Sequence, residues 1–432
     1  MTFFRLAIGC AALLANALLL SAAPAPPNIV MIISDDQHWG DYSFMGHPHI
    51  RTPNLDRLAS QSLTFTRGYV PASLCCPSLA SMITGQYPHQ HKVTSNDPPI
   101  PPGMKGAEFQ KSPQFAEGRE LMSKFIEAAP SLPRELARQG YLSLQTGKWW
   151  LKNYSRGGFT HGMTKGGRHG DAGLDIGRKT MQPIYDFIGE AKQQNKPFFV
   201  WYAPMMPHDP HTPPQRLVDK YKDKAPSLHV AKYWGMVEWF DETCGELLAH
   251  LDKQGLTDNT IVVFLTDNGW ITNPATGRYA EKSKQSQYDG GLRTPIMLRW
   301  PGKVKPQKSP HLATSLDFMP TLLTAAGLRV PPQMPGVNLL DEKVVAARKA
   351  LYGECFLHNF VDMQNPASSL KWRWVIEGDW KLIVPEKRNQ PKDVVELYHL
   401  KQDPNEEKNL AGTERPRVEH LTKLLDAWWS PK

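Results

Sequence analysis

The sequence predicts an α/β fold with a large, mostly parallel sheet between layers of helices, followed by a small C-terminal α+β subdomain. Three continuous apolar runs bounded by polar residues are typical of buried parallel strands, at residues 27–37, 196–204 and 259–269. Amphipathic helical patterns separate these runs, and such alternation brings parallel strands into one sheet. From about residue 346 the pattern changes to short strand-like segments and one closing helix.

The expected helices carry their own start and stop signals. Thr52 and Pro53 are typical of a helix start, as a cap and a first-turn residue. Gly140 and Gly255 each follow the last turn of a helical pattern. The segment 96–130 is rich in proline and shows little periodicity, so we expect it to be a long functional loop.

The N-terminus has the three regions of a secretory signal. Arg5 precedes an apolar run over residues 6–20, which ends in Ser21-Ala22-Ala23. This run is shorter than the ~20 residues that a membrane-spanning helix needs. We therefore expect a signal peptide over 1–23 and a periplasmic or secreted protein with no membrane contact after cleavage. The expected division of the mature chain is an α/β domain over 24–345 and a subdomain over 346–432.

Composition excludes several classes of protein. The 432 residues are 41% hydrophobic with a net charge of +8, which is ordinary for a globular protein, and no basic run predicts nucleic-acid binding. Four cysteines remain after signal removal, too few for a disulfide scaffold, and a bridge between Cys244 and Cys355 stays open.

Acidic and amide side chains follow two of the predicted strands. Asp35 and Asp36 end the first strand, and Asp267 and Asn268 end another. Ligands of open α/β sheets gather beyond the carboxyl ends of strands. Three carboxylates and one amide there predict a site for Ca²⁺ or Mg²⁺, although either pair alone is also typical of a solvated turn.

The adjacent Cys75 and Cys76 precede Pro77, which is expected to start a helix. A helix N-terminus attracts anions and lowers the pKa of a nearby thiol. A buried structural cysteine is the simpler interpretation of each residue taken alone.

The order of the motifs resembles the type I sulfatases of the alkaline phosphatase superfamily. The resemblance covers essentially the whole mature chain, and the ordered set is more specific than any one motif. The matching segments, in chain order, are Asp35-Asp36, Cys75-x-Pro77-Ser78 with Thr84-Gly85, Gly147-Lys148-Trp149, Pro207-His208, Asp267-Asn268-Gly269 and Lys284-x-x-x-Tyr288-Asp289-Gly290-Gly291, followed by the segments at 315–323 and 397–411.

The resemblance implies a mechanism and a role for each matched residue. Cys75 would be oxidised by a formylglycine-generating enzyme, and the hydrated formylglycine would attack the sulfur of a sulfated sugar or aryl sulfate. One Ca²⁺ ion would be held by Asp35, Asp36, Asp267, Asn268 and the modified Cys75. Lys148 and Lys284 would bind the sulfate oxygens, and His208 would contact the sulfate or act as general acid.

Two positions depart from the family pattern. The family has arginine two residues after the proline, where this chain has Leu79, and histidine two residues after Lys148, where it has Trp150. Both departures bear on formylglycine formation and sulfatase turnover. Histidines that could compensate are His89, His91, His161, His169, His208 and His211.

Three interpretations follow. The leading one is an exported, calcium-dependent sulfuric ester hydrolase. The second is a phosphodiester or phosphonate ester hydrolase of the same superfamily, and the third is a protein that binds sulfated ligands without catalysis.

Overall fold

The computed structural model describes residues 25–431. The expected signal peptide at 1–23 lies outside the described residues. The strands are β1 Asn28–Ser34, β2 Leu63–Tyr69, β3 Leu142–Gly147, β4 His161–Gly162, β5 Phe198–Ala203, β6 Thr260–Thr266, β7 Arg293–Arg299, β8 Gln307–Thr314, β9 Ala350–Phe356, β10 Leu370–Glu377, β11 Trp380–Pro385 and β12 Glu396–His399. The helices are α1 Pro53–Ser60, α2 Cys75–Thr84, α3 Pro88–His91, α4 Gly106–Phe109, α5 Pro113–Ala128, α6 Leu132–Ala137, α7 Gln182–Gln193, α8 Gln215–Tyr221, α9 Leu228–Lys253, α10 Asp289–Leu292, α11 Phe318–Ala325, α12 Glu342–Ala346 and α13 Arg415–Trp428.

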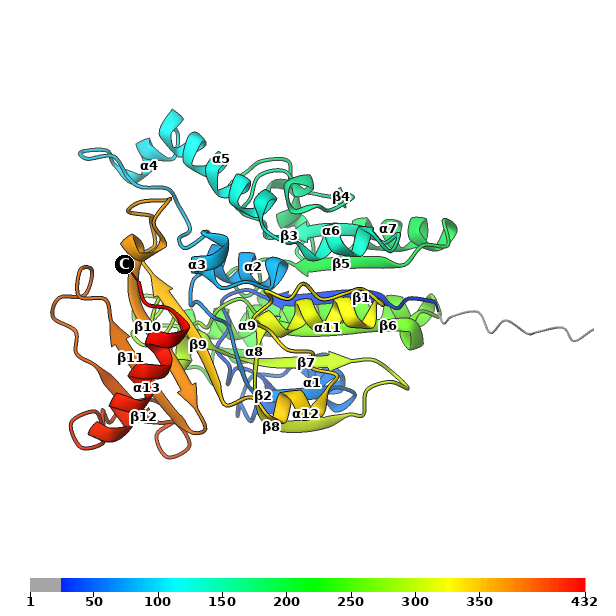
Figure 1. The fold of residues 1–432 in the computed structure, drawn as a ribbon. Helices are drawn as coiled ribbons and strands as arrows, with labels where there is room; N and C mark the ends of the chain where they lie inside the picture. Colours follow the sequence, from blue (N-terminus) through cyan, green and yellow to red (C-terminus); the bar gives the residue numbers. More distant parts are fainter. Residues whose placement is uncertain (1–24, 432) are drawn as a thin grey trace, which may run out of the picture.

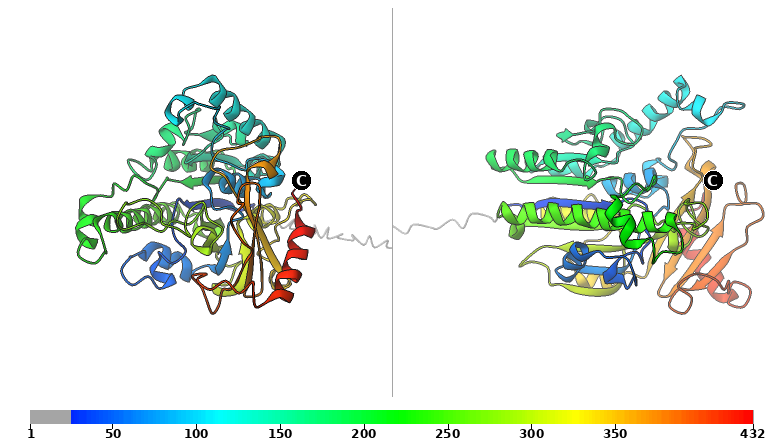
Figure 2. Two further views of the ribbon diagram at one scale, coloured as in Figure 1. Left: turned by 90° about the vertical axis from the view of Figure 1, so that its left-hand side faces the viewer. Right: turned by 180° about the vertical axis from the view of Figure 1, so that it is seen from behind.

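The predicted fold class is confirmed. The first eight strands form one sheet in the order β4-β3-β5-β1-β6-β7-β2-β8, and only β7 pairs antiparallel to its neighbours there (Figure 1). The last four strands form a separate antiparallel sheet in the order β12-β11-β10-β9, against which α13 packs (Figure 2).

The alternation of side chains along β1 builds two cores, one on each face of the large sheet. Ile29, Met31 and Ile33 pack with residues of α2, α5, α6 and α11. Val30 and Ile32 pack with residues of α1, α7 and α9 on the opposite face. Because β1 is buried on both faces, its sequence is continuously apolar.

The expectation of a long loop over 96–130 is wrong in its second half. Helix α5 runs through Pro113–Ala128, and the Ser112 side chain caps it by accepting a hydrogen bond from the backbone N–H of Phe115. Met122 and Ile126 on one face of α5 are fully buried in the core. The helix therefore forms through a cap and a narrow apolar stripe, which the preceding prolines obscure in the sequence.

Among residues 25–431, no helix is long and apolar enough to cross a membrane. The four cysteines in this part of the chain are buried free thiols, so Cys244 and Cys355 are not bridged.

Candidate active site

The register of two central strands brings the acidic residues together. Strands β1 and β6 pair in parallel so that Ser34 lies opposite Thr266, and both strands end at the same level. The backbone N–H of Asp36 donates to Asp267 Oδ1 at 3.0 Å. The side-chain amide of Asn268 donates to Asp36 Oδ1 at 2.6 Å. Asp35 joins them from the end of β1, and the whole group is buried.

The turn after β3 aims Lys148 at these carboxylates. Gly147 has φ +71°, and a Cβ atom there would lie 1.7 Å from the carbonyl oxygen of Ala203, so only glycine fits. The Lys148 ammonium lies 2.6 Å from Asp35 Oδ1 and 3.6 Å from Asp267 Oδ2. A cation therefore already lies between two of the buried carboxylates.

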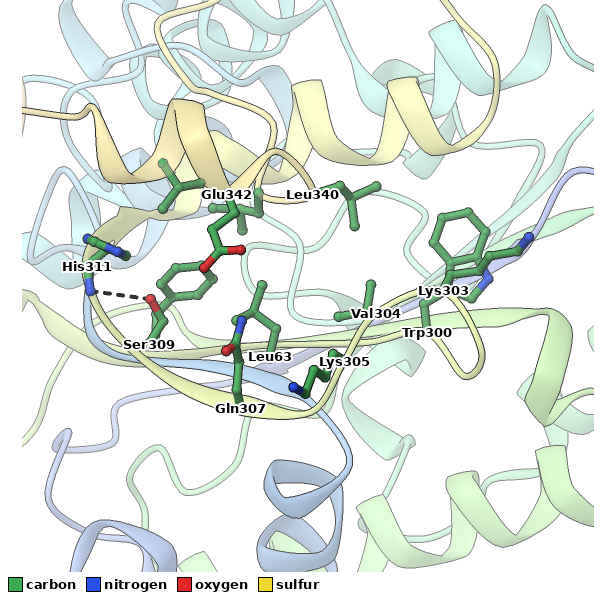
Figure 3. A pocket seen from close by; sticks show the side chains of 13 residues that line it. Leu63, Trp300, Lys303, Val304, Lys305, Gln307, Ser309, His311, Leu340 and Glu342 are labelled. Carbon is green, nitrogen blue, oxygen red and sulfur yellow. Dashed lines mark hydrogen bonds between the residues drawn. The ribbon is translucent and has the colours of Figure 1, made fainter.

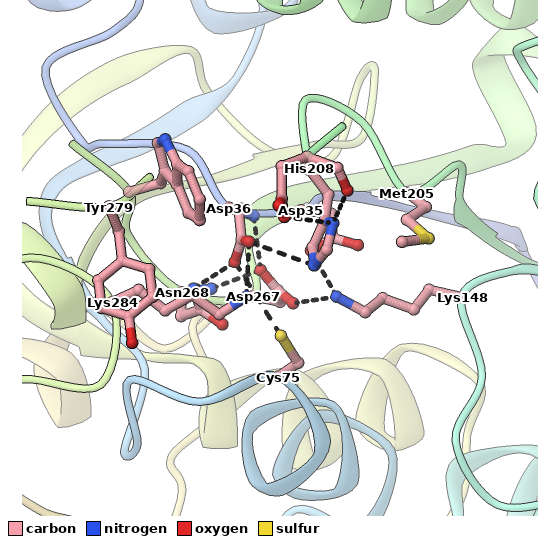
Figure 4. A network of polar contacts seen from close by, with 12 residues as sticks. Asp35, Asp36, Cys75, Lys148, Met205, His208, Asp267, Asn268, Tyr279 and Lys284 are labelled. Carbon is pink, nitrogen blue, oxygen red and sulfur yellow. Dashed lines mark hydrogen bonds and ion pairs between the residues drawn. The ribbon is translucent and has the colours of Figure 1, made fainter. Parts of the chain in front are cut away.

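His208 and Lys284 approach Asp36 from two different loops. The backbone N–H of Asp35 donates to the carbonyl of Met206 at 2.9 Å, which holds the loop after β5 beside the end of β1. His208 Nε2 lies 3.4 Å from Asp36 Oδ2, and the Lys284 ammonium lies 2.6 Å from the same oxygen. Figure 4 shows these side chains pointing toward one centre.

Cys75 lies at the N-terminus of α2 and faces this centre. The helix begins at Cys75, two residues before the Pro77 start that the sequence predicts. Cys75 Sγ lies 4.0 Å from Asp36 Oδ1. Figure 4 shows the Cys75 side chain pointing toward the carboxylates. Cys76 instead donates its backbone N–H to Asn96 Oδ1 at 2.8 Å. Of the two adjacent cysteines, Cys75 is therefore the one beside the carboxylates.

Burial dominates the ionisation of the thiol. It raises the pKa of Cys75 to about 12, and the opposing fields of Lys148 and Lys284 do not outweigh it. The expectation that the helix N-terminus lowers this pKa is therefore wrong. Burial also raises the pKa of Asp267, with Asp35 adding to the effect. Burial alone would raise the pKa of Asp36, but Lys284 and the other nearby cations hold it below its usual range.

Several buried oxygen atoms of the centre fit a metal ion. Within residues 25–431, Asp35 Oδ2, Asp267 Oδ2 and Asn268 Oδ1 accept no hydrogen bond. Buried polar atoms normally have partners, so three such oxygens at one place indicate a cation as the partner. Donor atoms of Asp35, Asp36, Cys75 and His208 also lie within 4.8 Å of one another. The oxygens suit a hard divalent cation, whereas sulfur and imidazole are softer donors.

A pocket of about 280 Å³ opens above Cys75. Trp150 lines it, whereas Trp149 packs edge-to-face against Trp201 in the core. The remaining lining residues are Asn96, Arg168, His169, His208, Asp209, Trp270, Arg278, Tyr279, Lys284, Gln285 and His358. Asn96, Arg168 and His358 are missed by the sequence reasoning, because they come from loops with no helical or strand periodicity.

The other candidate histidines do not line this pocket. His89 pairs with the buried Glu354 at 2.8 Å, and His91 hydrogen-bonds Ser81 inside the core. His161 lies 3.4 Å from Glu190. His211 packs edge-to-face against Trp270 beside the pocket but does not line it. His169 and His208 are therefore the two histidines of this set in the pocket wall.

Leu79 lies in α2, one turn after Cys75, and is 4% exposed. It belongs to the core cluster under α2 and supplies no polar atom to the site. The position where the family pattern has arginine is thus part of the apolar packing.

A second cavity, of about 240 Å³, lies beside β8 and α12 (Figure 3). Its walls are Leu63, Phe65, Val304, Leu339, Leu340 and Val345, with polar side chains such as Lys303 and Glu342 around them. It shares no lining residue with the pocket above Cys75.

Comparisons with known proteins find sulfatase relatives along most of the chain. A family model described as Sulfatase matches residues 27–328, and one described as N-sulphoglucosamine sulphohydrolase, C-terminal, matches residues 277–427. The chain is 30% identical over 364 residues to arylsulfatase A of Homo sapiens, which covers 72% of this chain and 66% of that protein. It thus spans just under two thirds of the length of this curated relative.

Two solved structures show the same fold at low sequence identity. A protein in complex with its substrate D-glucosamine-2-N,6-O-disulfate has a TM-score of 0.71 and 20% identity, with 93% of this chain and 97% of that chain covered. The phosphonate monoester hydrolase of Agrobacterium radiobacter has a TM-score of 0.69 and 18% identity, with 93% and 95% covered.

Proposed function

Because the chain belongs to the sulfatase family of the alkaline phosphatase superfamily, we propose that it is a sulfuric ester hydrolase acting on a sulfated carbohydrate or an aryl sulfate. The observation that carries the proposal is the position of Cys75, which faces Asp36 from a helix N-terminus. Two buried lysines lie in the same cluster of carboxylates: Lys148 pairs with Asp35, and Lys284 pairs with Asp36. The two ammonium groups and the positive end of the helix dipole would attract the three oxygens that share the negative charge of a sulfate ester.

Names of related proteins support this substrate range. Relatives are named for aryl sulfates and for N-acetylgalactosamine 6-sulfate, and a structure of the same fold holds a disulfated glucosamine. The exposed aromatic Tyr279 and the buried Trp270 in the pocket wall would offer apolar faces to a sugar or aryl ring.

The proposed roles of the side chains follow from their positions. Lys148 and Lys284 bind the sulfate oxygens and balance the charge that grows on them in the transition state. His208, 3.4 Å from Asp36 Oδ2, contacts the sulfate or donates a proton to the leaving alcohol. We assign this chemistry to residues 24–345, with 346–432 as a C-terminal subdomain.

The unmodified thiol is a poor nucleophile, because burial raises the pKa of Cys75 to about 12 and keeps it protonated at neutral pH. We propose that a formylglycine-generating enzyme converts Cys75 to formylglycine, whose hydrated aldehyde supplies a hydroxyl for attack on sulfur. Asp35, Asp36, Asp267 and Asn268, together with the modified residue, would hold one Ca²⁺ ion. The ion would withdraw electron density from sulfate oxygens when bound.

The N-terminal sequence pattern supports export to the periplasm or the medium. The phosphonate monoester hydrolase with the same fold supports the second interpretation, a phosphodiester or phosphonate ester substrate. Leu79 supplies no charge beside Cys75, and this observation favours the third, a protein that binds sulfated ligands without turnover.

Intact-mass measurement together with sulfate release tests the proposal. A peptide spanning Cys75 that is about 18 Da lighter than its sequence mass would show the aldehyde that nucleophilic catalysis needs. The substrate panel contains sulfated monosaccharides, an aryl sulfate, a phosphodiester and a phosphonate monoester. Cys75→Ala should abolish sulfate release, and Cys76→Ala is the matched control that should retain it. Sulfate release that survives Cys75→Ala would exclude the proposed nucleophile.

A further inference from the structure

The loop that carries His169 is held rigidly under the end of β3. Gly170 has φ +135°, and a Cβ atom there would lie 2.4 Å from the carbonyl oxygen of Gly147. The backbone N–H of Trp149 donates to the carbonyl of His169 at 3.0 Å. The Thr164 hydroxyl donates to the carbonyl of Gly170 at 2.9 Å. The backbone of His169 is therefore fixed beside Lys148 by contacts on both sides.

A chain of charged contacts orients the side chain of His169. Arg168 donates two hydrogen bonds to the buried Asp97, at 3.0 Å to Oδ1 and 2.6 Å to Oδ2. Such a bidentate pair fixes the plane of the guanidinium group. The guanidinium lies over the Trp150 ring, 4.7 Å from its centroid, and its third nitrogen lies 2.6 Å from His169 Nε2.

This contact determines the tautomer of the ring. Arginine has donors and no acceptor, so the Arg168 guanidinium donates and His169 Nε2 must accept. The ring proton of His169 is then on Nδ1. Burial and Arg168 lower the pKa of His169 to about 2, so the ring stays neutral. Its Nδ1–H is a single donor that does not change with pH in the working range.

His169 shares the pocket wall with Cys75 and Lys284, and its ring centroid lies 6.3 Å from that of His208. The Trp150 ring packs edge-to-face against His169 at 4.5 Å. Trp150 occupies the position where the resemblance implies a histidine, and it serves here as packing for a histidine from a different loop.

We propose that the Nδ1–H of His169 donates a hydrogen bond to the bound sulfate group, and that Arg168 and Asp97 are positioning residues that act through His169. The inference rests on the proposed sulfatase function and adds a donor to that site.

Two isosteric substitutions separate the roles of the two ring nitrogens. In His169→Asn the side-chain amide occupies the position of Nδ1 and keeps a donor toward the pocket. In His169→Gln the amide reaches the position of Nε2, so it keeps the contact with Arg168 and loses the donor. We expect kcat/KM to fall by about 10²–10³-fold in the Gln variant, which is typical for loss of one transition-state donor, and by less than about tenfold in the Asn variant.

A positioning role for Arg168 predicts non-additivity. Arg168→Met should lower kcat/KM in the wild-type background, but it should add little to the loss in His169→Gln, because the donor that Arg168 positions is then already absent. Purely structural roles predict the opposite ranking of the two His169 variants, since Gln preserves the Arg168 contact and Asn does not. An equal or greater loss in His169→Asn, or additive losses in the double variant, would therefore overturn the inference.

Binding of inorganic sulfate, measured by calorimetry on the same full-length proteins, provides a readout besides turnover. The Kd should rise roughly tenfold in His169→Gln and change little in His169→Asn, because one hydrogen bond to a charged group is lost. If the wild-type protein binds sulfate but releases none from the panel, the proposed function fails and the Kd ranking alone decides the role of His169. If sulfate does not bind at all, both proposals fail.

Discussion

Replacing Lys148 by methionine removes the charge of this side chain while keeping an unbranched apolar stem one atom shorter. This substitution tests the centre of the site most directly. Lys148 is 1% exposed, and its ammonium lies 2.6 Å from Asp35 Oδ1 and 3.6 Å from Asp267 Oδ2. With an effective dielectric constant of about 20, these two attractions amount to about 6 and about 5 kcal/mol before the cost of burying the charges. After that offset, loss of one partner of a buried pair typically lowers the free energy of unfolding by about 3–5 kcal/mol.

The same substitution should change activity and the response to calcium. We expect kcat/KM for sulfate release to fall by about 10²–10³-fold, since the role proposed for Lys148 is to balance charge on the sulfate oxygens. The Lys148 ammonium also repels a cation bound to the same carboxylates, so saturating Ca²⁺ should stabilise the variant more than the wild type. Urea unfolding with Ca²⁺ and with EDTA measures both stabilities, and calcium at about 100 times its Kd should add about 2.7 kcal/mol.

Lys179→Met is the matched control. Lys179 is 72% exposed and forms an exposed ion pair with Asp175, which contributes at most about 1 kcal/mol. It should leave unfolding, sulfate release and the calcium response unchanged. The expected loss in the free energy of unfolding of Lys148→Met is about 3–5 kcal/mol. A loss below about 1 kcal/mol, or full retention of activity, would show that the described electrostatics of the site are wrong.

Three further predictions address the metal, the Lys148 turn and pH. Asp267→Ala and Asn268→Ala should each lower the amount of bound calcium, because each removes a buried oxygen that accepts no hydrogen bond within residues 25–431. Elemental analysis of dialysed protein measures the calcium content, and an unchanged content would place the ion elsewhere. Gly147→Ala should lower both Tm and kcat/KM, because its Cβ would lie 1.7 Å from a carbonyl oxygen. The control is Gly189→Ala in α7, where no atom lies near the new Cβ, and it should raise the free energy of unfolding by about 0.5–1 kcal/mol. Burial raises the pKa of Asp241 to about 7, so its contribution to stability is full below pH ~4 and is lost as pH rises through about 7. Asp241→Asn should therefore flatten the fall in unfolding free energy over that interval, and parallel pH profiles for the two proteins would contradict the assignment.

The fold class and the residue types of the site follow from the amino-acid sequence. Strands buried on both faces must be continuously apolar, so β1, β5 and β6 were visible as runs. Asp35-Asp36 and Asp267-Asn268 directly follow two of these runs, and parallel strands end at one edge of a sheet. Helix α5 was missed because its cap and narrow apolar stripe follow a proline-rich segment without a clear helical period.

The interactions among these residues depend instead on tertiary packing. Burial depends on everything packed around a group, so the raised pKa of Cys75 does not follow from its place at a helix N-terminus. Leu79 is buried because helices distant in sequence pack in the same core cluster. The tautomer of His169 depends on Arg168, which Asp97 orients from 71 positions earlier in the chain. The order of residues along the chain predicts which side chains can reach one edge of the sheet. The distances between these side chains, their burial and the direction of their hydrogen bonds depend on how separate loops pack together.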